Sequence, residues 1–288
     1  MPNVNRSVPR VAFQGELGSY GHEACERYFG NRIAVKPYRT LRDVFHMAEI
    51  GRCTFGVVAV ENSYEGSINE TYDLLASTTS KVCGEIEVRV RHSLIAKPGT
   101  KQGKITTVYS HPQALAQCAR YIRAHKLEAV PTYDTAGSVK LIKAMQSRKV
   151  GAIASRRAAE LYSMQVISEG IEDSEVNYTR FLILGKRIAS RSGNDKTSII
   201  FGVKHKPGSL YRALAALSIQ GINLTKIESR PVKDTPWQYN FYVDFYGHVQ
   251  DSVCREALRG LRKRATFVKV LGSYATAASL RYFSTQGR

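Results

Sequence analysis

The first polar cluster that could do chemistry directly follows an apolar segment, Phe55–Val60, that has the length of a buried strand. The cluster consists of Glu61, Asn62 and Ser63. In open α/β sheets, ligands bind beyond the carboxyl ends of the strands. A carboxylate, an amide and a hydroxyl in this position could bind and orient a polar substrate. Capping of the following segment is an equally good role for Ser63.

A second polar cluster follows the apolar segment 105–109 in the same way. Ser110 could contact a ligand, or it could cap a helix that opens near Pro112, where proline suits the first turn. Gln117 lies two turns along that helix, on a face that could turn toward the same site. His111 is paired with no nucleophilic serine or cysteine, so we interpret it as a local hydrogen-bonding residue.

A third group is the triplet Thr179, Arg180 and Phe181, which opens the apolar segment 178–184. If this segment is a strand, Thr179 and Phe181 point to one face and Arg180 to the other. Core packing is the ordinary reason for such an alternation, so the triplet alone does not identify a site. Thr135, in the motif DTAGS at 134–138, is a further hydroxyl that could face a substrate.

The segment Gly15–Ser19 lies between a predicted strand and a predicted helix, where backbone N–H groups can hold an anion. Its glycines, with Gly21, give the pattern GxxGxxG, which differs from the dinucleotide-binding pattern GxGxxG. No Gly-Lys-Ser/Thr follows, so it is no phosphate loop of the nucleotide hydrolases either. A tight turn and a substrate-facing loop remain the two interpretations.

Apolar segments alternate with amphipathic helical segments through the first part of the chain, which indicates a largely parallel α/β sheet. Apolar and polar residues alternate over 86–94, so we expect one strand there with one buried face. The expected strands are 11–13, 55–60, 86–94, 105–109, 150–154 and 178–184. Four helices are expected: one that ends near 29, one that opens near 112, and two that span 138–146 and 156–162.

A polar break at 185–195, with no helical or strand period, predicts a linker. The elements expected beyond it are strands at 197–203, 222–232, 239–246 and 267–274, with helices at 207–220 and 252–264. The resulting order βαββαβ is that of a ferredoxin-like sandwich. We expect the first ten residues to be a short disordered lead-in and residues 275–288 to be frayed.

The composition is that of a globular chain with two domains, and no apolar run approaches the roughly 20 residues of a membrane span. The five cysteines are odd in number and form no CxxC pair, so reduced and mostly buried thiols are expected. The net charge of +18 would suit a nucleic-acid binder or an enzyme that attracts a small polyanion. No nucleic-acid-binding signature accompanies it, and the expected location is the cytoplasm.

Across nearly its whole length, the chain resembles the prephenate dehydratase family. The motifs that support this are VAFQGELGSYGHEA at 11–24, GVVAVENSYEGSINETYDLL at 56–75, VYSHPQALAQC at 108–118, DTAGS at 134–138, GAIASRRAAELY at 151–162 and NYTRFLILG at 177–185. The last part resembles the ACT regulatory module of the same enzymes, through KPGSLYRAL at 206–214 and LTKIESRP at 224–231.

The resemblance implies an α/β fold, with a two-lobed catalytic domain like a periplasmic binding protein and a ferredoxin-like ACT domain. The expected boundaries are 10–186 for the catalytic domain, with lobes at 10–84 plus 175–186 and at 85–174, then 187–195 for the linker and 196–275 for the ACT domain. On length, we expect no chorismate mutase domain before Val11.

The implied reaction converts prephenate into phenylpyruvate: the ring hydroxyl departs as CO2 leaves, and the ring becomes aromatic. A proton donor at that hydroxyl would supply part of the acceleration. Thr179 matches the family's essential threonine and is expected to be this donor or relay, with Glu61 or a bound water as its partner. Arg180 would hold a carboxylate and Phe181 would form an apolar wall. The other expected substrate contacts are Asn62, Ser63, Ser110, Gln117 and Thr135, with no cofactor and no metal.

ACT modules usually pair across subunits, so the resemblance also implies a homodimer or homotetramer that binds phenylalanine at the ACT interface. The expected effector contacts are Gly208, Ser209, Leu210 and Tyr211 from one subunit and Glu228, Ser229, Arg230 and Pro231 from its neighbour. Backbone N–H groups near Gly208 would receive the effector's carboxylate at a helix start. Arg230 could instead pair with Glu228 on its own strand.

Three alternatives remain open. Arogenate dehydratase is the near one, because it uses the same fold and motifs on the aminated substrate. A small-molecule binding or sensor protein is an alternative of another class, and the intact triplet at 179–181 argues against it. Nucleic-acid binding is indicated by the net charge alone and would make retention on DNA or RNA salt-dependent.

Overall fold

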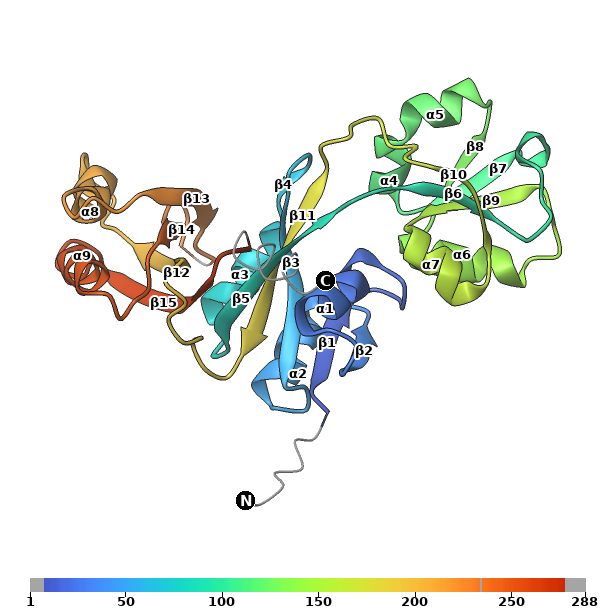
Figure 1. Cartoon of the computed structure of the whole chain (residues 1–288). Helices are drawn as coiled ribbons and strands as arrows, with labels where there is room; N and C mark the ends of the chain where they lie inside the picture. The colour runs from blue at the N-terminus through green and yellow to red at the C-terminus, as the bar shows by residue number, and fades with distance from the viewer. Residues whose placement is uncertain (1–7, 234, 278–288) are drawn as a thin grey trace, which may run out of the picture. The chain divides into compact units, whose positions relative to one another are not determined.

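The computed structural model describes residues 8–233 and 235–277 (Figure 1). The predicted lead-in therefore lies mainly outside the described residues, as does most of the tail predicted to be frayed. Contacts divide the chain into two compact units. Among the described residues, the first comprises 8–44, 57–67 and 87–181, and the second comprises 45–56, 68–86, 182–233 and 235–277.

A six-stranded sheet has the order β2-β1-β3-β11-β5, with β4 paired to β3. Its strands are β1 (Arg10–Gln14), β2 (Ala34–Tyr38), β3 (Phe55–Asn62), β4 (Gly66–Ser67), β5 (Lys81–Arg89) and β11 (Tyr178–Gly185). The helices between them are α1 (Tyr20–Phe29), α2 (Leu41–Glu49) and α3 (Asn69–Ser77). Because β3 and β11 are neighbours, the end of one and the start of the other bring Asn62 and Thr179 together.

A second sheet, of order β10-β6-β9-β7-β8, lies entirely in the first unit. Its strands are β6 (Ser93–Ala96), β7 (Thr107–Ser110), β8 (Glu128–Pro131), β9 (Val150–Ala154) and β10 (Gln165–Glu169). The helices are α4 (Pro112–Gln117), α5 (Ala119–Ala124), α6 (Thr135–Ala144) and α7 (Arg156–Tyr162), with the short 3-10 turn η1 (Gln102–Lys104).

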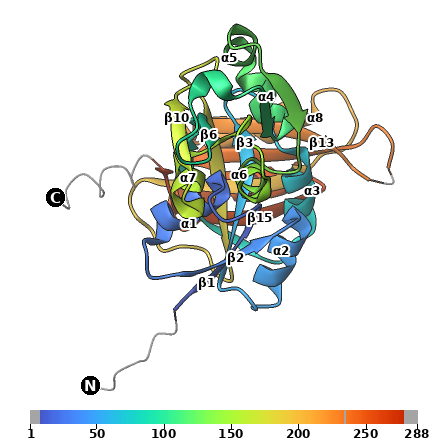
Figure 2. The ribbon, with the colours of Figure 1, turned by 90° about the vertical axis from the view of Figure 1, so that its right-hand side faces the viewer.

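Helices cover both faces of this second sheet (Figures 1 and 2). Leu94 and Ile153 face a core that includes α4 and α5, whereas Ile95 and Ala152 face a core with α6 and α7. Strands buried on both faces read as continuous apolar runs. This explains why the run at 150–154 is apolar at every position and why its bounds were predicted correctly.

The prediction of one strand over 86–94 is wrong. The segment supplies the end of β5 and the start of β6, which belong to different sheets, and it leaves the ladder at Val90–His92. There, the Val90 N–H donates to the Asn177 carbonyl, at 2.7 Å. The period-two pattern continues because alternate side chains stay buried on both sides of the crossing, so the pattern alone could not reveal the change of sheet.

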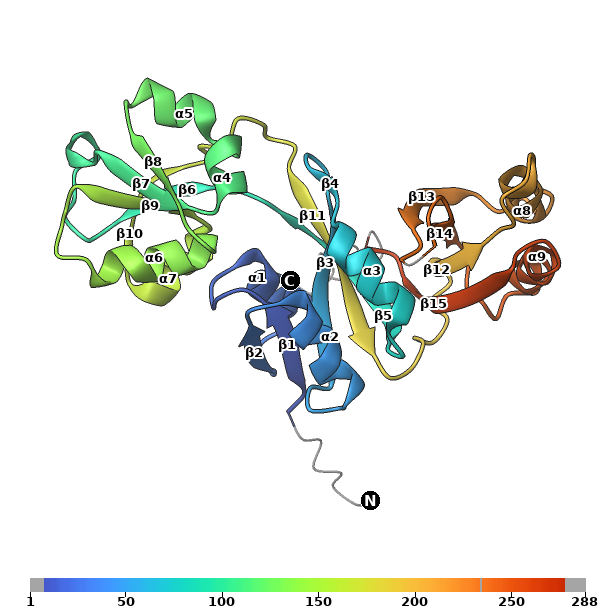
Figure 3. The ribbon, with the colours of Figure 1, turned by 180° about the vertical axis from the view of Figure 1, so that it is seen from behind.

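The predicted βαββαβ order is confirmed for the last part of the chain, and the α/β fold class is confirmed as well. Its antiparallel sheet has the order β13-β14-β12-β15. The elements are β12 (Asp195–Gly202), α8 (Ser209–Ser218), β13 (Leu224–Pro231), β14 (Tyr239–Tyr246), α9 (Ser252–Arg262) and β15 (Phe267–Ala275). Both helices pack on one face of the sheet (Figure 3), over a core that includes Phe201, Leu217 and Leu258.

Within the second unit, α3 and β5 are held to this antiparallel sheet. The Lys269 ammonium donates to the carbonyls of Leu75, Ala76 and Thr78 at the end of α3, at 3.1, 2.8 and 2.6 Å. A cation at the carboxyl end of a helix satisfies its last carbonyls and its dipole. A Cβ on Gly272 would come within 1.8 Å of the Val82 carbonyl oxygen, so β15 can approach β5 this closely only with glycine there.

Within the described part of the chain, no helix combines the length and the apolar character that crossing a bilayer requires. Cys25, Cys53, Cys118 and Cys254 are buried, and Cys83 is half-buried.

Candidate active site

Asn62 and Thr179 lie in direct contact where β3 ends and β11 begins. The Asn62 Nδ2 donates to Thr179 Oγ1 at 3.0 Å and to Asn177 Oδ1 at 2.8 Å. The Asn62 Oδ1 accepts from the backbone N–H groups of Tyr64 and Glu65, at 2.9 and 3.0 Å. Asn62 is 9% exposed, so its amide is largely buried and is held by hydrogen bonds on both sides.

Ser63 helps to hold the two strands together. Its backbone N–H donates to the Tyr178 carbonyl at 2.8 Å, and its Oγ accepts from the Tyr178 N–H at 2.9 Å. The Ser63 hydroxyl oxygen therefore completes the pairing of β3 with β11, directly beside Thr179. This geometry gives Ser63 a structural role at the edge of the candidate site.

Gln117 joins the same group through Asn177. The Gln117 Oε1 accepts from Asn177 Nδ2 at 3.0 Å and lies 3.0 Å from His92 Nε2. The Gln117 Nε2 donates to Glu65 Oε1 at 3.4 Å. Gln117 and Asn177 are 8% and 2% exposed, so these amides depend on one another for their hydrogen bonds.

His92 and Tyr20 extend this hydrogen-bonded group to α1. The Tyr20 hydroxyl donates to the Arg91 carbonyl at 2.8 Å and lies 3.1 Å from His92 Nδ1. Burial lowers the pKa of His92, because it disfavours the charged ring, so the imidazole is neutral at pH 7. Burial also raises the pKa of Tyr20, which keeps its hydroxyl protonated.

Glu61 and Arg180 form a half-buried ion pair next to this group, with 3.9 Å between Oε2 and Nη1. The Arg180 side chain is 12% exposed, and Phe181 is 5% exposed and belongs to the core. The guanidinium is close to the surface at the start of β11 and could meet an anionic group. Phe181 is packed in the core, which is the ordinary role that the alternation along this strand predicts for it.

Ser110 and Thr135 do not join the group around Thr179. Ser110 is fully buried, and its Oγ donates to the Ile153 carbonyl at 2.5 Å. The expectation that Ser110 caps α4 is wrong: His111 is the cap, and its Nδ1 accepts from the Gln113 N–H at 3.3 Å. His111 thus has the local hydrogen-bonding role predicted for it. Thr135 is the first residue of α6, and Asp134 caps that helix.

The loop at 15–19 is a capped turn. The Gly18 N–H donates to His22 Nδ1 at 3.0 Å, and Ser19 Oγ accepts from the His22 N–H at 3.4 Å. The Gly18 carbonyl accepts from Ser155 Oγ at 2.7 Å. Because the Gly18 N–H already has an acceptor, it is not available to an anion in this conformation.

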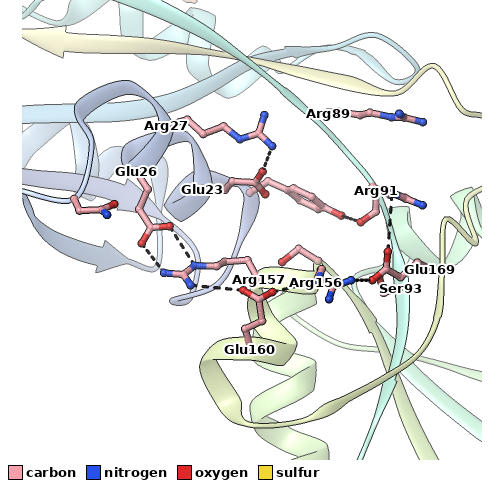
Figure 4. Close-up of a pocket in the computed structure, with 13 residues that line it drawn as sticks. Glu23, Glu26, Arg27, Arg89, Arg91, Ser93, Arg156, Arg157, Glu160 and Glu169 are labelled. Atoms are coloured by element: carbon pink, nitrogen blue, oxygen red, sulfur yellow. Dashed lines mark hydrogen bonds and ion pairs between the residues drawn. The ribbon is translucent and has the colours of Figure 1, made fainter. Parts of the chain in front are cut away.

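A cavity of about 700 Å³ in the first unit is lined by none of the residues predicted from the sequence, although Tyr20, the neighbour of His92, borders it. Arginine and glutamate side chains pair around it (Figure 4). Arg157 contacts Glu26 at 2.7 Å, Arg27 contacts Glu23 at 2.5 Å, and Arg156 contacts Glu169. These acidic groups are already paired with arginines, so the cavity offers little net charge to a ligand.

Comparison with known proteins decides the family. The sequence profile of the prephenate dehydratase family matches residues 11–189, and that of the ACT domain matches residues 197–262. The chain belongs to the prephenate dehydratase family. It is therefore a lyase of the dehydratase type with an ACT domain at its carboxyl end.

Two curated relatives show the range of the family. The chain is 40% identical to a bifunctional chorismate mutase/prephenate dehydratase of Stutzerimonas stutzeri over 270 residues, which cover 93% of this chain and 73% of the relative. It is 39% identical over 281 residues to arogenate dehydratase/prephenate dehydratase 2, chloroplastic, of Arabidopsis thaliana, covering 94% and 74%.

Two solved structures have the same fold throughout. Prephenate dehydratase from Arthrobacter aurescens, in complex with L-Phe, has a TM-score of 0.86 at 28% identity and covers 93% of this chain and 90% of its own. GqqA, described as a novel type of quorum quenching acylase, has a TM-score of 0.85 at 30% identity and covers 93% and 98%.

The two segments predicted to contact an effector lie in the ACT domain. Gly208 precedes α8 with a left-handed φ of 75°, and the Ser209 N–H donates to the Lys206 carbonyl at 3.1 Å. That N–H is therefore occupied here, contrary to the expectation that it is available for a carboxylate. Leu210 is half-buried, and Tyr211 is 77% exposed.

In β13, the side chains of Glu228 and Arg230 point to the half-buried face, and Ser229 and Pro231 are exposed. The alternative pairing of Arg230 with Glu228 is not the one that the structure shows. Arg230 Nε lies 3.2 Å from Asp73 Oδ1 on α3, while Glu228 Oε2 lies 3.7 Å from Lys226 Nζ.

Sequence reasoning missed Asn177, His92 and Tyr20. Asn177 stands inside the motif NYTRFLILG but outside the predicted triplet, and His92 was assigned to the buried face of a strand. The signal that could have found them is a polar side chain placed among apolar residues. Buried amides and imidazoles need hydrogen-bond partners, so such a residue indicates a hydrogen-bonded group. Among the described residues, no group of three or more His, Cys, Asp or Glu side chains is arranged to hold a metal ion.

Proposed function

We propose that this enzyme converts prephenate into phenylpyruvate, CO2 and water, as a step of phenylalanine biosynthesis. The observation that supports this most directly is the state of the Thr179 hydroxyl. Its oxygen accepts a hydrogen bond from Asn62, and among the described residues none accepts the hydroxyl's own proton. A positioned O–H donor is what the departing ring hydroxyl needs.

In the proposed mechanism, Thr179 donates to the ring hydroxyl as the C–O bond breaks. The electron pair of the carboxylate C–C bond moves into the ring, which becomes aromatic as CO2 leaves. The hydroxyl of threonine is a weak acid, so it acts as an aligned hydrogen-bond donor while a bound water or Glu61 supplies the proton. Donors placed where charge develops are worth the most in such sites.

The remaining roles follow from position and are part of the proposal. Arg180 holds the side-chain carboxylate of the substrate, and Phe181 supports the ring side of the site. The other proposed substrate contacts are Glu61, Asn62, Ser63, Ser110, Gln117 and Thr135. Of these, Ser110 has the weakest support, because its hydroxyl is buried and bonded to Ile153. The proposed boundaries are 10–186 for the catalytic domain, 187–195 for the linker and 196–275 for the ACT domain.

Product analysis tests the reaction. Purified enzyme supplied with prephenate at neutral pH should form phenylpyruvate and CO2 in equal amounts, well above the uncatalysed rate. Protein without the Thr179 hydroxyl serves as the blank for contaminating activity. Prephenate left unchanged by well-folded enzyme would refute the proposal.

Arogenate is the alternative substrate, and it differs from prephenate in carrying an amine where prephenate has a keto group. The relative from Arabidopsis is named for both activities, which keeps this alternative open. The acylase activity named for GqqA would need an activated nucleophile. The contacts of Thr179 with an amide, Asn62, and not with a base give that activity no support here.

We further propose that phenylalanine binds between ACT domains of two subunits in a homodimer or homotetramer and lowers activity. The complex of the relative with L-Phe supports this effector, and the glycine turn that opens α8 at Gly208 supports the place. An effector that prefers a less active arrangement shifts the population by its differential affinity. We place this enzyme in the cytoplasm, where five free thiols would stay reduced.

Replacing Gly208 with valine is expected to raise the phenylalanine concentration for half-inhibition by about tenfold or more. Valine is strained at a left-handed φ of 75°, and its Cβ would come within 2.7 Å of Arg212 Nη1, so the start of α8 must change. The turnover rate without effector should stay within about twofold. The measurement is a phenylalanine titration of activity.

Gly221→Val is the matched control. Gly221 follows the other end of α8 with a φ of 68°, and a Cβ added there would have no atom within 4 Å, so the strain is alike and the place differs. Equal inhibition of the parent and the Gly208 variant would show that the effector site has been misplaced. An equal loss of phenylalanine inhibition in the Gly208 and Gly221 variants would indicate general strain of the domain.

A further inference from the structure

The direction of each hydrogen bond around Thr179 can be deduced from the backbone. The N–H groups of Tyr64 and Glu65 can only donate, so the side-chain atom of Asn62 that faces them must be the oxygen. The Asn62 nitrogen then faces Asn177 and Thr179 and donates to both. Asn177 must accept with Oδ1, which turns its own nitrogen toward Gln117.

Gln117 receives two donors through one oxygen. Asn177 Nδ2 donates to Gln117 Oε1, which fixes the orientation of the Gln117 amide. The Glu65 carboxylate, 3.4 Å from the Gln117 nitrogen, can only accept, so it independently requires the same amide orientation. His92 Nε2, 3.0 Å from the same oxygen, must therefore carry a proton. In the neutral ring, Nδ1 is then an acceptor. It shares the single proton of the Tyr20 hydroxyl with the Arg91 carbonyl, and the two acceptors lie 3.1 and 2.8 Å from that oxygen.

We propose that Asn177 and His92 are positioning residues for the dehydratase reaction. They fix the orientation of the Gln117 amide. Asn177 also supplies a second acceptor for the Asn62 amide that donates to Thr179 Oγ1, so Thr179 keeps its own proton for the substrate. This proposal builds on the proposed function and adds two residues outside the predicted site. Both side chains are buried, each 2% exposed, and they act through others without touching the reacting atoms.

The geometry assigns positioning and excludes proton transport along this path. Two donors, from His92 and from Asn177, converge on Gln117 Oε1, and an amide oxygen that accepts from both sides passes no proton onward. Asn62 likewise donates in both directions with one nitrogen. The proton that leaves with the ring hydroxyl must then come from the solvent side of Thr179.

Several charged or titratable groups surround these two residues and enter any pH profile. The His92 backbone N–H donates to Glu172 Oε2 at 2.9 Å, and the Gln117 carbonyl accepts from the Asp173 N–H at 2.6 Å. From the other elements, the groups are Tyr20 on α1, Glu65 beside Gln117, and the pair Glu61 and Arg180 at the strand ends.

Asn177→Asp tests the proposed direction of the hydrogen bonds, because it keeps size and the acceptor for Asn62. Its carboxylate would set an oxygen against Gln117 Oε1 where a donor stood. We expect kcat to fall by about 10- to 100-fold at pH 8, with KM within about threefold. Burial and the nearby glutamates raise the pKa of such a carboxyl. Once protonated, it can donate to Gln117 again, so the ratio of variant to parent kcat should rise about tenfold between pH 8 and pH 5.5.

Asn177→Ala is the matched control, because it removes the same contacts without a titrating group. It should lower kcat by a ratio to the parent that does not change with pH. A structural role alone would give both variants the same flat ratio. That result, in a parent enzyme that forms phenylpyruvate, would overturn the positioning role and leave the proposed function intact. A parent that forms no phenylpyruvate would refute the proposed function itself.

The tautomer of His92 provides a readout that does not depend on activity or on folding of the Asn177 variants. In the ¹⁵N-histidine NMR spectrum of the parent at pH 7.5, His92 should show a protonated Nε2 and an unprotonated Nδ1. Its signals are identified by their loss in His92→Gln. Glutamine places an amide nitrogen near the Nε2 position and asparagine does not, so His92→Gln should keep kcat within about threefold and His92→Asn should lose about tenfold. An Nδ1-protonated ring, or equal rates for the two variants, would overturn the proposal.

Discussion

Thr179→Val is expected to lower kcat for prephenate by about 10²- to 10⁴-fold and to leave KM within about threefold. Valine has the shape of threonine but no hydroxyl, so the contact that donates to the departing group disappears while the strand stays intact. The Asn62 amide loses one acceptor and keeps Asn177. Steady-state rates of phenylpyruvate formation measure the effect, with circular dichroism as the check on folding.

Thr179→Ser is the matched control, since it keeps the hydroxyl and removes only a methyl group. It should retain a kcat within about tenfold of the parent, because serine must also hold the correct rotamer. A Thr179→Val enzyme as fast as Thr179→Ser would remove this hydroxyl from the mechanism. Equal and severe losses in both would instead indicate that the methyl group packs against the substrate.

Lys196→Met is expected to reduce the free energy of unfolding by about 3 kcal/mol. Lys196 Nζ lies 2.7 Å from Glu85 Oε1, and the side chains are 12% and 1% exposed. Methionine fills a similar volume but leaves the Glu85 carboxylate in a buried site without this cation. Breaking a buried ion pair from one side costs more than the pair contributes, because the remaining charge has lost its hydration. Urea unfolding followed by circular dichroism measures the change.

The double variant Glu85→Gln with Lys196→Met is the control for this interaction. In the parent, the Ala277 N–H donates to Glu85 Oε1 at 3.0 Å. Glutamine keeps an oxygen that can accept this hydrogen bond, and it carries no charge. The double variant should regain more than half of the lost stability. If it is as unstable as Lys196→Met alone, the loss comes from packing of the lysine stem and not from the charge.

Helices and strands whose ends are marked by a capping or turn residue were placed well from the sequence. Ser155 separates the apolar run of β9 from α7 and caps that helix by accepting from the Ala158 N–H, so both elements have the predicted bounds. The helix α3 was missed because its cap position is Ile68, which offers no side-chain hydrogen bond. The strand β2 was missed because it is short, half-exposed and contains Pro37.

The candidate site was predictable in part for a topological reason. Polar residues at strand ends can be read from the sequence, and neighbouring strands then bring Asn62 to Thr179. The contribution of Asn177 and His92 could not be read in this way. Their importance depends on which atom donates, and that direction follows from backbone N–H groups placed by a turn at 64–65.

Oligomer formation and the effector stay predictions, and so does the preference for prephenate over arogenate. The central claim is that prephenate is the substrate. Prephenate and arogenate lose the same hydroxyl and CO2, and they differ at one side-chain group. That group lies away from the ring, so Thr179 and Asn62 should act alike on either compound. Any preference must therefore come from the residues that meet the side chain.

The most direct measurement is a steady-state comparison of the two substrates with the same purified enzyme and no added phenylalanine. We predict a kcat/KM for prephenate at least about tenfold above that for arogenate, which corresponds to about 1.4 kcal/mol of transition-state preference. Phenylpyruvate and phenylalanine, the two products, are separated by chromatography so that neither rate is inferred from absorbance alone. A higher kcat/KM for arogenate, or turnover of neither compound by folded enzyme, would contradict the assignment of prephenate as the substrate.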